Sequence, residues 1–121
     1  MVQIKLKRVY EDMSDSDGFR VLVDQLWPRG MKKEYLHYDL WAKDITPSSD
    51  LRKWFHDDPA DRWDSFAAMY TKELNQSEAV KKFIETIRPQ DTVTLLYASK
   101  EPEHNHAKVL KAYLDKMLES V

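Results

Sequence analysis

The sequence predicts an α/β protein: a single small three-layer domain over residues 1–121, with a mainly parallel sheet flanked by helices. Two observations lead to this prediction. Residues 3–10 place apolar side chains on one face and Lys5 and Lys7 on the other, and residues 19–24 and 92–98 contain mainly apolar runs, patterns typical of strands. Apolar residues at helical spacing lie between the second and third of these runs, and again after the third. A strand joined through helices to a later strand usually pairs with it in parallel.

Turn-forming residues define the predicted strands. Asp17-Gly18 is the strongest breaker between the first strand and the second. The centre of the second strand, Val21-Leu22-Val23, is continuously apolar, as expected for a strand covered on both faces. Pro28 and Gly30 end this strand, and the residues that follow, 31–45, mix aromatic and charged side chains at no clear period. We leave residues 31–45 without a predicted element.

Capping residues locate the helices. Thr46-Pro47 and Asp58-Pro59 each pair an N-cap residue with a proline at the first helical position, so we expect helices to begin there. A third helix is expected from about Ser77 to Ile87, before Pro89. The last helix is expected from about Asn105 to Leu118.

Composition excludes several classes of function. The chain has 21 acidic and 19 basic residues, and a net charge of −2 does not suit binding to the backbone of duplex nucleic acid. The absence of cysteine excludes disulfides, thiol catalysis and zinc–thiolate sites. The N-terminal residues lack the apolar run of a signal peptide, and no stretch approaches the roughly 20 apolar residues that span a bilayer. We expect a cytoplasmic protein with no membrane association.

The candidate site follows from the predicted sheet. Ligands of parallel sheets bind beyond the carboxyl ends of the strands. Two segments that are distant in sequence, Asp24–Gly30 and Ser99–His106, follow the second and third predicted strands. We therefore expect these segments to meet in space and to form the walls of one crevice.

The first segment supplies a carboxylate, an indole and a guanidinium. Asp24 can act as a base or nucleophile. Alternatively, it forms a structural ion pair with Arg20, Arg29 or Arg52, or it caps the following turn. In Trp27-Pro28-Arg29-Gly30, Arg29 can bind phosphate or carboxylate while Trp27 stacks on a flat group. Alternatively, Trp27 belongs to the core and Arg29 pairs with an acid.

The second segment opens the last helix. Exposed amides and the helix dipole make a helix start an anion site, and Asn105 is a natural N-cap. His106, or His104, can add a titratable donor or a proton relay. The alternative is that both histidines are only capping or surface residues. Their spacing, together with Asp57 and Asp58, does not form a metal pattern, so we expect no metal and no cofactor.

Further cations complete the candidate ligand site. Arg8, Lys43 and Arg52, if clustered with Arg29, would make a cationic pocket suited to a small anion rather than a long polyanion. If scattered, they are solvated surface charge. Tyr97, at the end of the third predicted strand, is a second candidate for stacking on a ligand.

The combination of these motifs resembles the YeaO-like proteins, a branch of a bacterial domain family of unknown function. The resemblance spans almost the whole chain and rests on Lys7-Arg8-Val9-Tyr10, Asp17-Gly18 with Arg20, Leu22-Val23-Asp24, Leu26-Trp27-Pro28-Arg29-Gly30, Trp41 with Lys43, Pro47-Ser48, Leu51-Arg52 with Trp54-Phe55, Tyr70 with Glu73-Leu74, Thr94-Leu95-Leu96-Tyr97, Asn105-His106-Ala107 and Leu110. The family commonly has Arg where this chain has Gln25. Larger relatives have Cys-His-Arg where this chain has Asn105-His106-Ala107, which implies that His106 is shared and that the cysteine is not required.

The resemblance implies an α/β fold and a bacterial origin, and it specifies no reaction. Two hypotheses about function follow from the residues. In the first, the protein binds or processes a small phosphate- or nucleotide-like anion, with Asp24 and His106 as the acid–base pair. In the second, it is a non-catalytic ligand sensor or interaction module, with a possible link to transcription, that uses the same pocket or an aromatic surface formed by Trp41, Trp54 and Trp63. Nothing in the sequence distinguishes a monomer from a homodimer.

Overall fold

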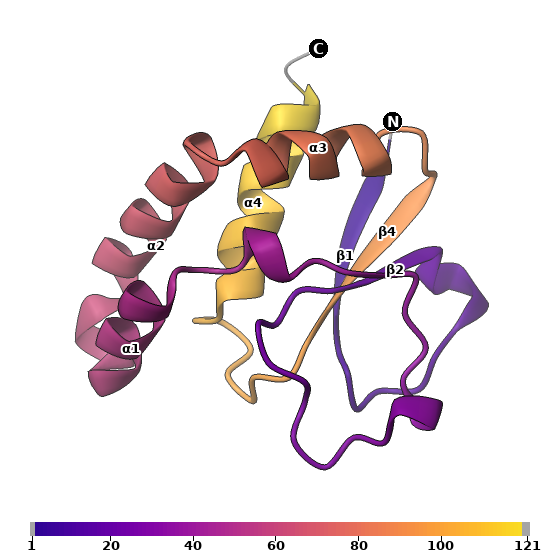
Figure 1. Ribbon diagram of the computed structural model, residues 1–121, viewed down its shortest axis with the longest axis horizontal. Helices are drawn as coiled ribbons and strands as arrows, with labels where there is room; N and C mark the ends of the chain where they lie inside the picture. Colours follow the sequence, from indigo (N-terminus) through magenta and orange to yellow (C-terminus); the bar gives the residue numbers. More distant parts are fainter. Residues whose placement is uncertain (1, 120–121) are drawn as a thin grey trace.

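The computed structural model describes residues 2–119, in which four α-helices accompany a four-stranded sheet (Figure 1). The strands are β1 (Gln3–Arg8), β2 (Phe19–Leu22), β3 (Leu40–Trp41) and β4 (Thr92–Tyr97). The helices are α1 (Ser49–Asp57), α2 (Pro59–Asn75), α3 (Glu78–Ile87) and α4 (His106–Glu119). Short 3-10 turns form η1 (Asp15–Asp17), η2 (Lys33–Tyr35) and η3 (Lys43–Ile45). No helix in this part of the chain combines the length and apolar character that crossing a membrane requires.

The sheet is parallel throughout, in the order β1-β4-β2-β3. β4 lies between β1 and β2, with Leu95 opposite both Leu6 and Val21. The predicted parallel pairing of the second strand with the third is therefore confirmed. β3 is a two-residue edge strand within 31–45, and it was not predicted because two residues are too short to show a period.

The two faces of the sheet are covered differently. Alternate strand residues, including Val21, Val93 and Leu95, join the core formed with the four helices. On the other face, Leu22 and Leu96 pack in a second cluster with Leu36 and the indoles of Trp27 and Trp41. The predicted α/β class is confirmed, but the third layer consists of loops and 3-10 turns instead of α-helices. In Figure 1 η1, η2 and the loops around them lie on the opposite side of the strands from the helices, whereas η3 lies on the helical side and its Ile45 belongs to the core formed with the helices.

The first helix begins two residues later than predicted. Ser48, and not Thr46, is the N-cap of α1, and its hydroxyl accepts a hydrogen bond from the Leu51 N–H. The Thr46 hydroxyl instead donates to the Lys43 carbonyl at 2.8 Å, which assigns Thr46 to the end of η3. Pro47 is a buried loop residue. The Ser48 backbone N–H and hydroxyl also donate to the two Glu73 carboxylate oxygens, and these hydrogen bonds hold the start of α1 against α2.

The other predicted caps are confirmed. Asp58 caps α2 with Pro59 in its first turn, and Ser77 caps α3. Before α4, the Asn105 side-chain oxygen accepts a hydrogen bond from the Lys108 N–H at 3.0 Å. Since these side chains satisfy amides that the helix itself leaves unpaired, local sequence determines where the three helices begin.

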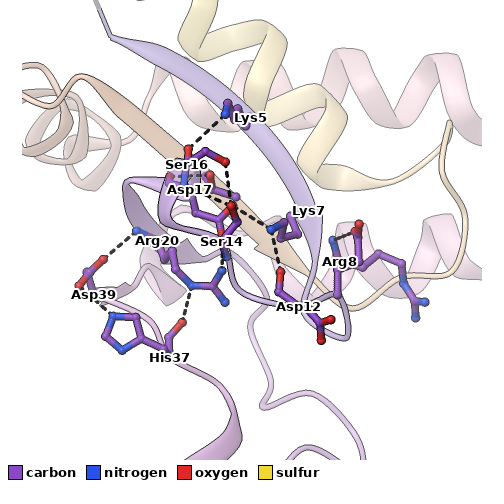
Figure 2. A network of polar contacts seen from close by, with 12 residues as sticks. Lys5, Lys7, Arg8, Asp12, Ser14, Ser16, Asp17, Arg20, His37 and Asp39 are labelled. Carbon is purple, nitrogen blue, oxygen red and sulfur yellow. Dashed lines mark hydrogen bonds and ion pairs between the residues drawn. The ribbon is translucent and has the colours of Figure 1, made fainter.

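A buried ionic cluster around Asp17 ties the loops to the sheet (Figure 2). Asp17 is 3% exposed, and its carboxylate pairs with Lys7 Nζ at 2.8 Å and with the Arg20 guanidinium. Arg20 Nε also donates to the His37 carbonyl, and the Arg20 backbone N–H donates to Asp39. Burial raises the pKa of Asp17, but hydrogen bonds from Lys7, the Ser14 amide and Arg20 outweigh burial and lower the pKa below its usual value.

Candidate functional site

A cleft of about 490 Å³ lies beyond the carboxyl ends of β2 and β4. Its lining comes from the loop after β2, the end of η3 with α1, one side chain of α2, and the segment between β4 and α4. The lining residues are Asp24, Gln25, Leu26, Trp27, Pro28, Arg29, Thr46, Pro47, Arg52, Phe55, His56, Phe66, Ala98, Ser99, His104, Asn105 and His106. The two segments that were expected to converge, Asp24–Gly30 and Ser99–His106, therefore do meet at one cleft.

Asp24 and His106 are in direct contact at the floor of this cleft. His106 Nε2 lies 3.2 Å from Asp24 Oδ1 and 2.7 Å from the Val23 carbonyl oxygen. Both oxygens can only accept, so Nε2 carries the proton and Nδ1 is the ring nitrogen that can take up another. The second carboxylate oxygen, Asp24 Oδ2, accepts the Ala98 N–H at 2.9 Å. Both side chains are therefore held in place by the backbone that leaves β2 and β4.

Two guanidinium groups line the cleft without an acidic partner. Within residues 2–119, neither Arg29 nor Arg52 makes a side-chain hydrogen bond or an ion pair, and the Nε atom of Arg52 is buried without an acceptor. The one carboxylate in the described lining belongs to Asp24, which is already bonded to His106 and to Ala98. The cleft thus holds more positive than negative formal charge, although the whole chain is acidic.

Aromatic and apolar side chains form the rest of the walls. Phe55 and Phe66 stack with their centroids 4.2 Å apart. The Trp27 indole N–H donates to the Met31 carbonyl at 2.6 Å, and its ring packs edge-on against Tyr38 and Trp41. These contacts fix Trp27 in the loop layer while one side of it lines the cleft. The site can therefore accept a ligand with an apolar or planar portion next to its charge.

Hydrogen bonds and one ring contact hold the residues at the start of α4 in place. Asn105 is 3% exposed, and its side-chain N–H donates to the Glu101 carbonyl at 2.7 Å while its oxygen caps the helix. The Glu101 carboxylate accepts the backbone N–H groups of Glu103 and His104, which lowers the pKa of Glu101. The His104 ring stacks on Trp63 at 4.8 Å. Asn105 is therefore the N-cap of α4, as predicted, and both its side-chain nitrogen and its side-chain oxygen already make a hydrogen bond within the protein.

Five of the predicted site residues lie outside the lining. The Arg8 guanidinium donates to the Ala98 and Ser99 carbonyl oxygens at 3.0 Å and so holds the segment after β4 in place. Arg20 is buried against Asp17 on the loop-covered face, and the Lys43 ammonium lies 3.9 Å from the centre of the Trp41 ring. Tyr97 is 8% exposed within the core, and Gly30 is an exposed turn residue with φ 76°.

The three tryptophans of the proposed aromatic surface do not form one patch. Trp41 belongs to the cluster on the loop-covered face, and its indole N–H donates to the Asp24 carbonyl at 2.7 Å. Trp54 and Trp63 pack against the helical core, with the Arg62 guanidinium over the Trp54 ring. All three side chains are half-buried.

Several lining residues were not among the predicted ones, notably Gln25, His56 and Phe66. His56 could have been predicted as a lining residue, because it follows the candidate residue Arg52 by four positions and therefore lies on the same face of α1. Gln25 and Phe66 carried no comparable signal, since the first lies in a loop and the second fits an ordinary core stripe. In the described part of the chain, no three His, Cys, Asp or Glu side chains lie close enough together to hold a metal ion.

Comparison with known proteins identifies the family. A family model described as the inactive DUF488-N3 subclade matches residues 3–121. The uncharacterized protein YeaO of Escherichia coli is 46% identical over 113 residues, covering 93% of this chain and 97% of YeaO. The uncharacterized proteins Mb3100c of Mycobacterium bovis and Rv3073c of Mycobacterium tuberculosis are each 38% identical over 113 residues, covering 93% of this chain and 94% of each relative. No solved structure matches the chain. The chain belongs to the inactive DUF488-N3 subclade, the YeaO-like family that its motifs predicted.

Proposed function

We propose that this protein binds a small ligand with an anionic, phosphate-like group in the cleft at the carboxyl edge of its sheet. The observation that carries the proposal is the pair of unpartnered guanidinium groups of Arg29 and Arg52. The arginines that support the fold are bonded differently: Arg8 and Arg62 donate to backbone carbonyls, and Arg20 pairs with Asp17.

Arg52 is the stronger of the two anchors. Its side chain is half-buried on α1, and its Nε atom has neither water access nor a protein acceptor. A buried donor without a partner is unfavourable, and the penalty is larger when the group is charged. An oxyanion that engages the guanidinium relieves this penalty and forms charge-assisted hydrogen bonds, whereas Arg29 is exposed and would contribute mainly through long-range attraction.

The remaining lining suits a ligand with a second, less polar portion. Trp27, Phe55 and Phe66 supply aromatic surface, and Leu26 is 67% exposed at the cleft. Three of the four histidines in the chain, His56, His104 and His106, also line it. This combination fits a phosphorylated metabolite or a nucleotide better than an extended polyanion.

The test is ligand binding with a matched pair of arginine variants. We expect inorganic phosphate, AMP or a sugar phosphate to raise the thermal unfolding midpoint of the wild-type protein, because a ligand that binds the native state stabilises it. Arg52→Gln should weaken binding by about tenfold or more, and Arg29→Gln by less. Arg88→Gln is the control, since Arg88 is exposed at the far end of α3 and lies outside the cleft. If none of these compounds shifts the midpoint at millimolar concentration, the proposal is wrong.

A second candidate is acid–base catalysis on the same ligand, favoured by the contact between Asp24 and His106. The pair leaves Nδ1 of His106 as the proton-accepting atom, an arrangement that general bases share. The description of the matching family as inactive favours binding without turnover. Turnover of a bound compound that falls by about 10²–10⁴-fold in His106→Asn, with little change in affinity, would establish the catalytic alternative.

A further inference from the structure

Two buried side-chain atoms in residues 2–119 lack any hydrogen-bond partner, and both belong to residues that line the cleft. One is the Arg52 Nε atom on α1, which is a donor. The other is the Gln25 Oε1 atom in the loop after β2, which is an acceptor. Buried polar atoms in folded proteins are paired in the great majority of cases, so two exceptions in one cleft indicate a common cause.

The two atoms have opposite requirements. They are a donor and an acceptor, yet they are not bonded to each other. A bound group that satisfies both must accept a hydrogen bond from Arg52 and donate one to Gln25. A ligand with acceptor atoms only can meet the first requirement but places lone pairs against the Gln25 oxygen.

The other side-chain oxygens of the lining are already engaged. Asp24 accepts from Ala98 and contacts His106, and the Asn105 oxygen caps α4. The Ser99 hydroxyl accepts the Glu101 N–H, and the Thr46 hydroxyl donates to Lys43. Gln25 Oε1 is therefore the buried side-chain oxygen in the described lining that has no hydrogen-bond partner. The Gln25 side chain is half-buried but its Oε1 atom is fully buried, so the amide must rotate to bring Oε1 to a ligand.

We propose that the cleft selects an oxyanion that retains a proton, such as hydrogen phosphate, over one that has only lone pairs, such as sulfate. The inference rests on the proposed anion binding and assigns Gln25 as the residue that determines specificity. Arg52 binds either anion, whereas only the O–H of hydrogen phosphate can donate to Gln25 Oε1. Discrimination of this kind arises because the wrong ligand leaves a buried polar atom unpaired.

The experiment compares phosphate with sulfate at neutral pH and constant ionic strength, with binding followed by amide chemical shifts. In the wild-type protein, phosphate should bind about tenfold more tightly than sulfate. Gln25→Leu, which keeps the approximate size and removes the acceptor, should abolish this preference by weakening phosphate binding to the level of sulfate binding. Gln3→Leu makes the same chemical change on an exposed residue of β1 outside the cleft and should keep the preference.

Methyl phosphate separates free phosphate from phosphate esters. Its second ionisation lies at about pH 6, so at neutral pH it is mainly a dianion without an O–H. We expect it to bind as weakly as sulfate, so a phosphorylated metabolite or nucleotide would owe its affinity to contacts between its organic portion and the aromatic lining. Methyl phosphate that binds as tightly as phosphate would show that the proton is not recognised and would overturn the inference.

The remaining outcomes separate this inference from the proposed function. Equal binding of phosphate and sulfate, both weakened by Arg52→Gln, would overturn the inference and leave anion binding supported. A preference for sulfate, or a phosphate preference that persists in Gln25→Leu, would also overturn it. Binding of neither anion would remove both proposals together.

Discussion

His106 Nε2 lies 2.7 Å from the Val23 carbonyl oxygen and 3.2 Å from Asp24 Oδ1, so one ring nitrogen at the start of α4 is held by two successive residues beyond β2. Asp24 in turn accepts the Ala98 N–H beyond β4. This arrangement joins three backbone segments at the floor of the cleft. It defines the position of α4 relative to the sheet at the point where a ligand would bind.

The coupling between these two side chains can be measured. Asp24→Ala leaves the Ala98 N–H without its acceptor, and it should lower the free energy of unfolding by about 1–3 kcal/mol. His106→Ala should lower it by a similar amount through loss of the bond to Val23. The double variant should be less destabilised than the sum of the two, by at least about 0.5 kcal/mol, because the residues share one contact. Urea unfolding at neutral pH measures all three values, and strict additivity would contradict a direct interaction.

Replacing Gly18 should destabilise the fold more than replacing Gly30, the other glycine. Its φ is 65° and ψ −132°, and a Cβ added there would lie 2.4 Å from the Thr92 carbonyl oxygen. Gly18→Ala should therefore lower the free energy of unfolding by well over about 2 kcal/mol, from backbone strain and the clash together. Gly30 has a φ of 76° with open space around it, so Gly30→Ala is the matched control and should cost about 1 kcal/mol from strain alone. Similar thermal unfolding midpoints for the two variants would contradict the close contact between Gly18 and Thr92.

The Asp17 cluster predicts a specific dependence of stability on pH. The pKa of Asp17 is lowered on folding, so the folded state stabilises the carboxylate and the unfolded state binds the proton more readily. This contribution is complete above the usual value of 3.8 and is lost as the pH falls through the lower pKa of the folded state. In Asp17→Asn, the free energy of unfolding should therefore depend less on pH below about 4 than in the wild-type protein.

A control variant isolates this effect. Asp64 is an exposed carboxylate on α2, outside the Asp17 cluster, and Asp64→Asn should keep the acid sensitivity of the wild-type protein. Chemical unfolding at a series of acidic pH values gives the comparison. An Asp17→Asn profile parallel to that of the wild-type protein would show that the Lys7 and Arg20 contacts do not bias the titration of Asp17.

Local signals were sufficient for most of the regular structure. The apolar centres of β2 and β4 and the caps Asp58 and Ser77 were visible because each depends on neighbours within a few residues. Thr46 showed the limit of such signals, since its hydroxyl is used by the η3 turn and Ser48 takes the capping role. No element was predicted for residues 31–45, because their structure depends on packing against the sheet and their sequence shows no helical or strand period.

The sequence by itself determined the family, the parallel α/β class and the meeting of Asp24–Gly30 with Ser99–His106, because strand direction places all carboxyl ends at one edge. Only the tertiary structure decided which charged residues face the cleft. The sequence alone does not distinguish Arg20 from Arg52. In the folded protein Arg20 lies on the loop-covered face of the sheet and pairs with Asp17, whereas Arg52 on α1 lines the cleft and has no acidic partner. The physical reason is that the partner of a charge is set by contacts between segments distant in sequence, and these exist only once the chain has folded.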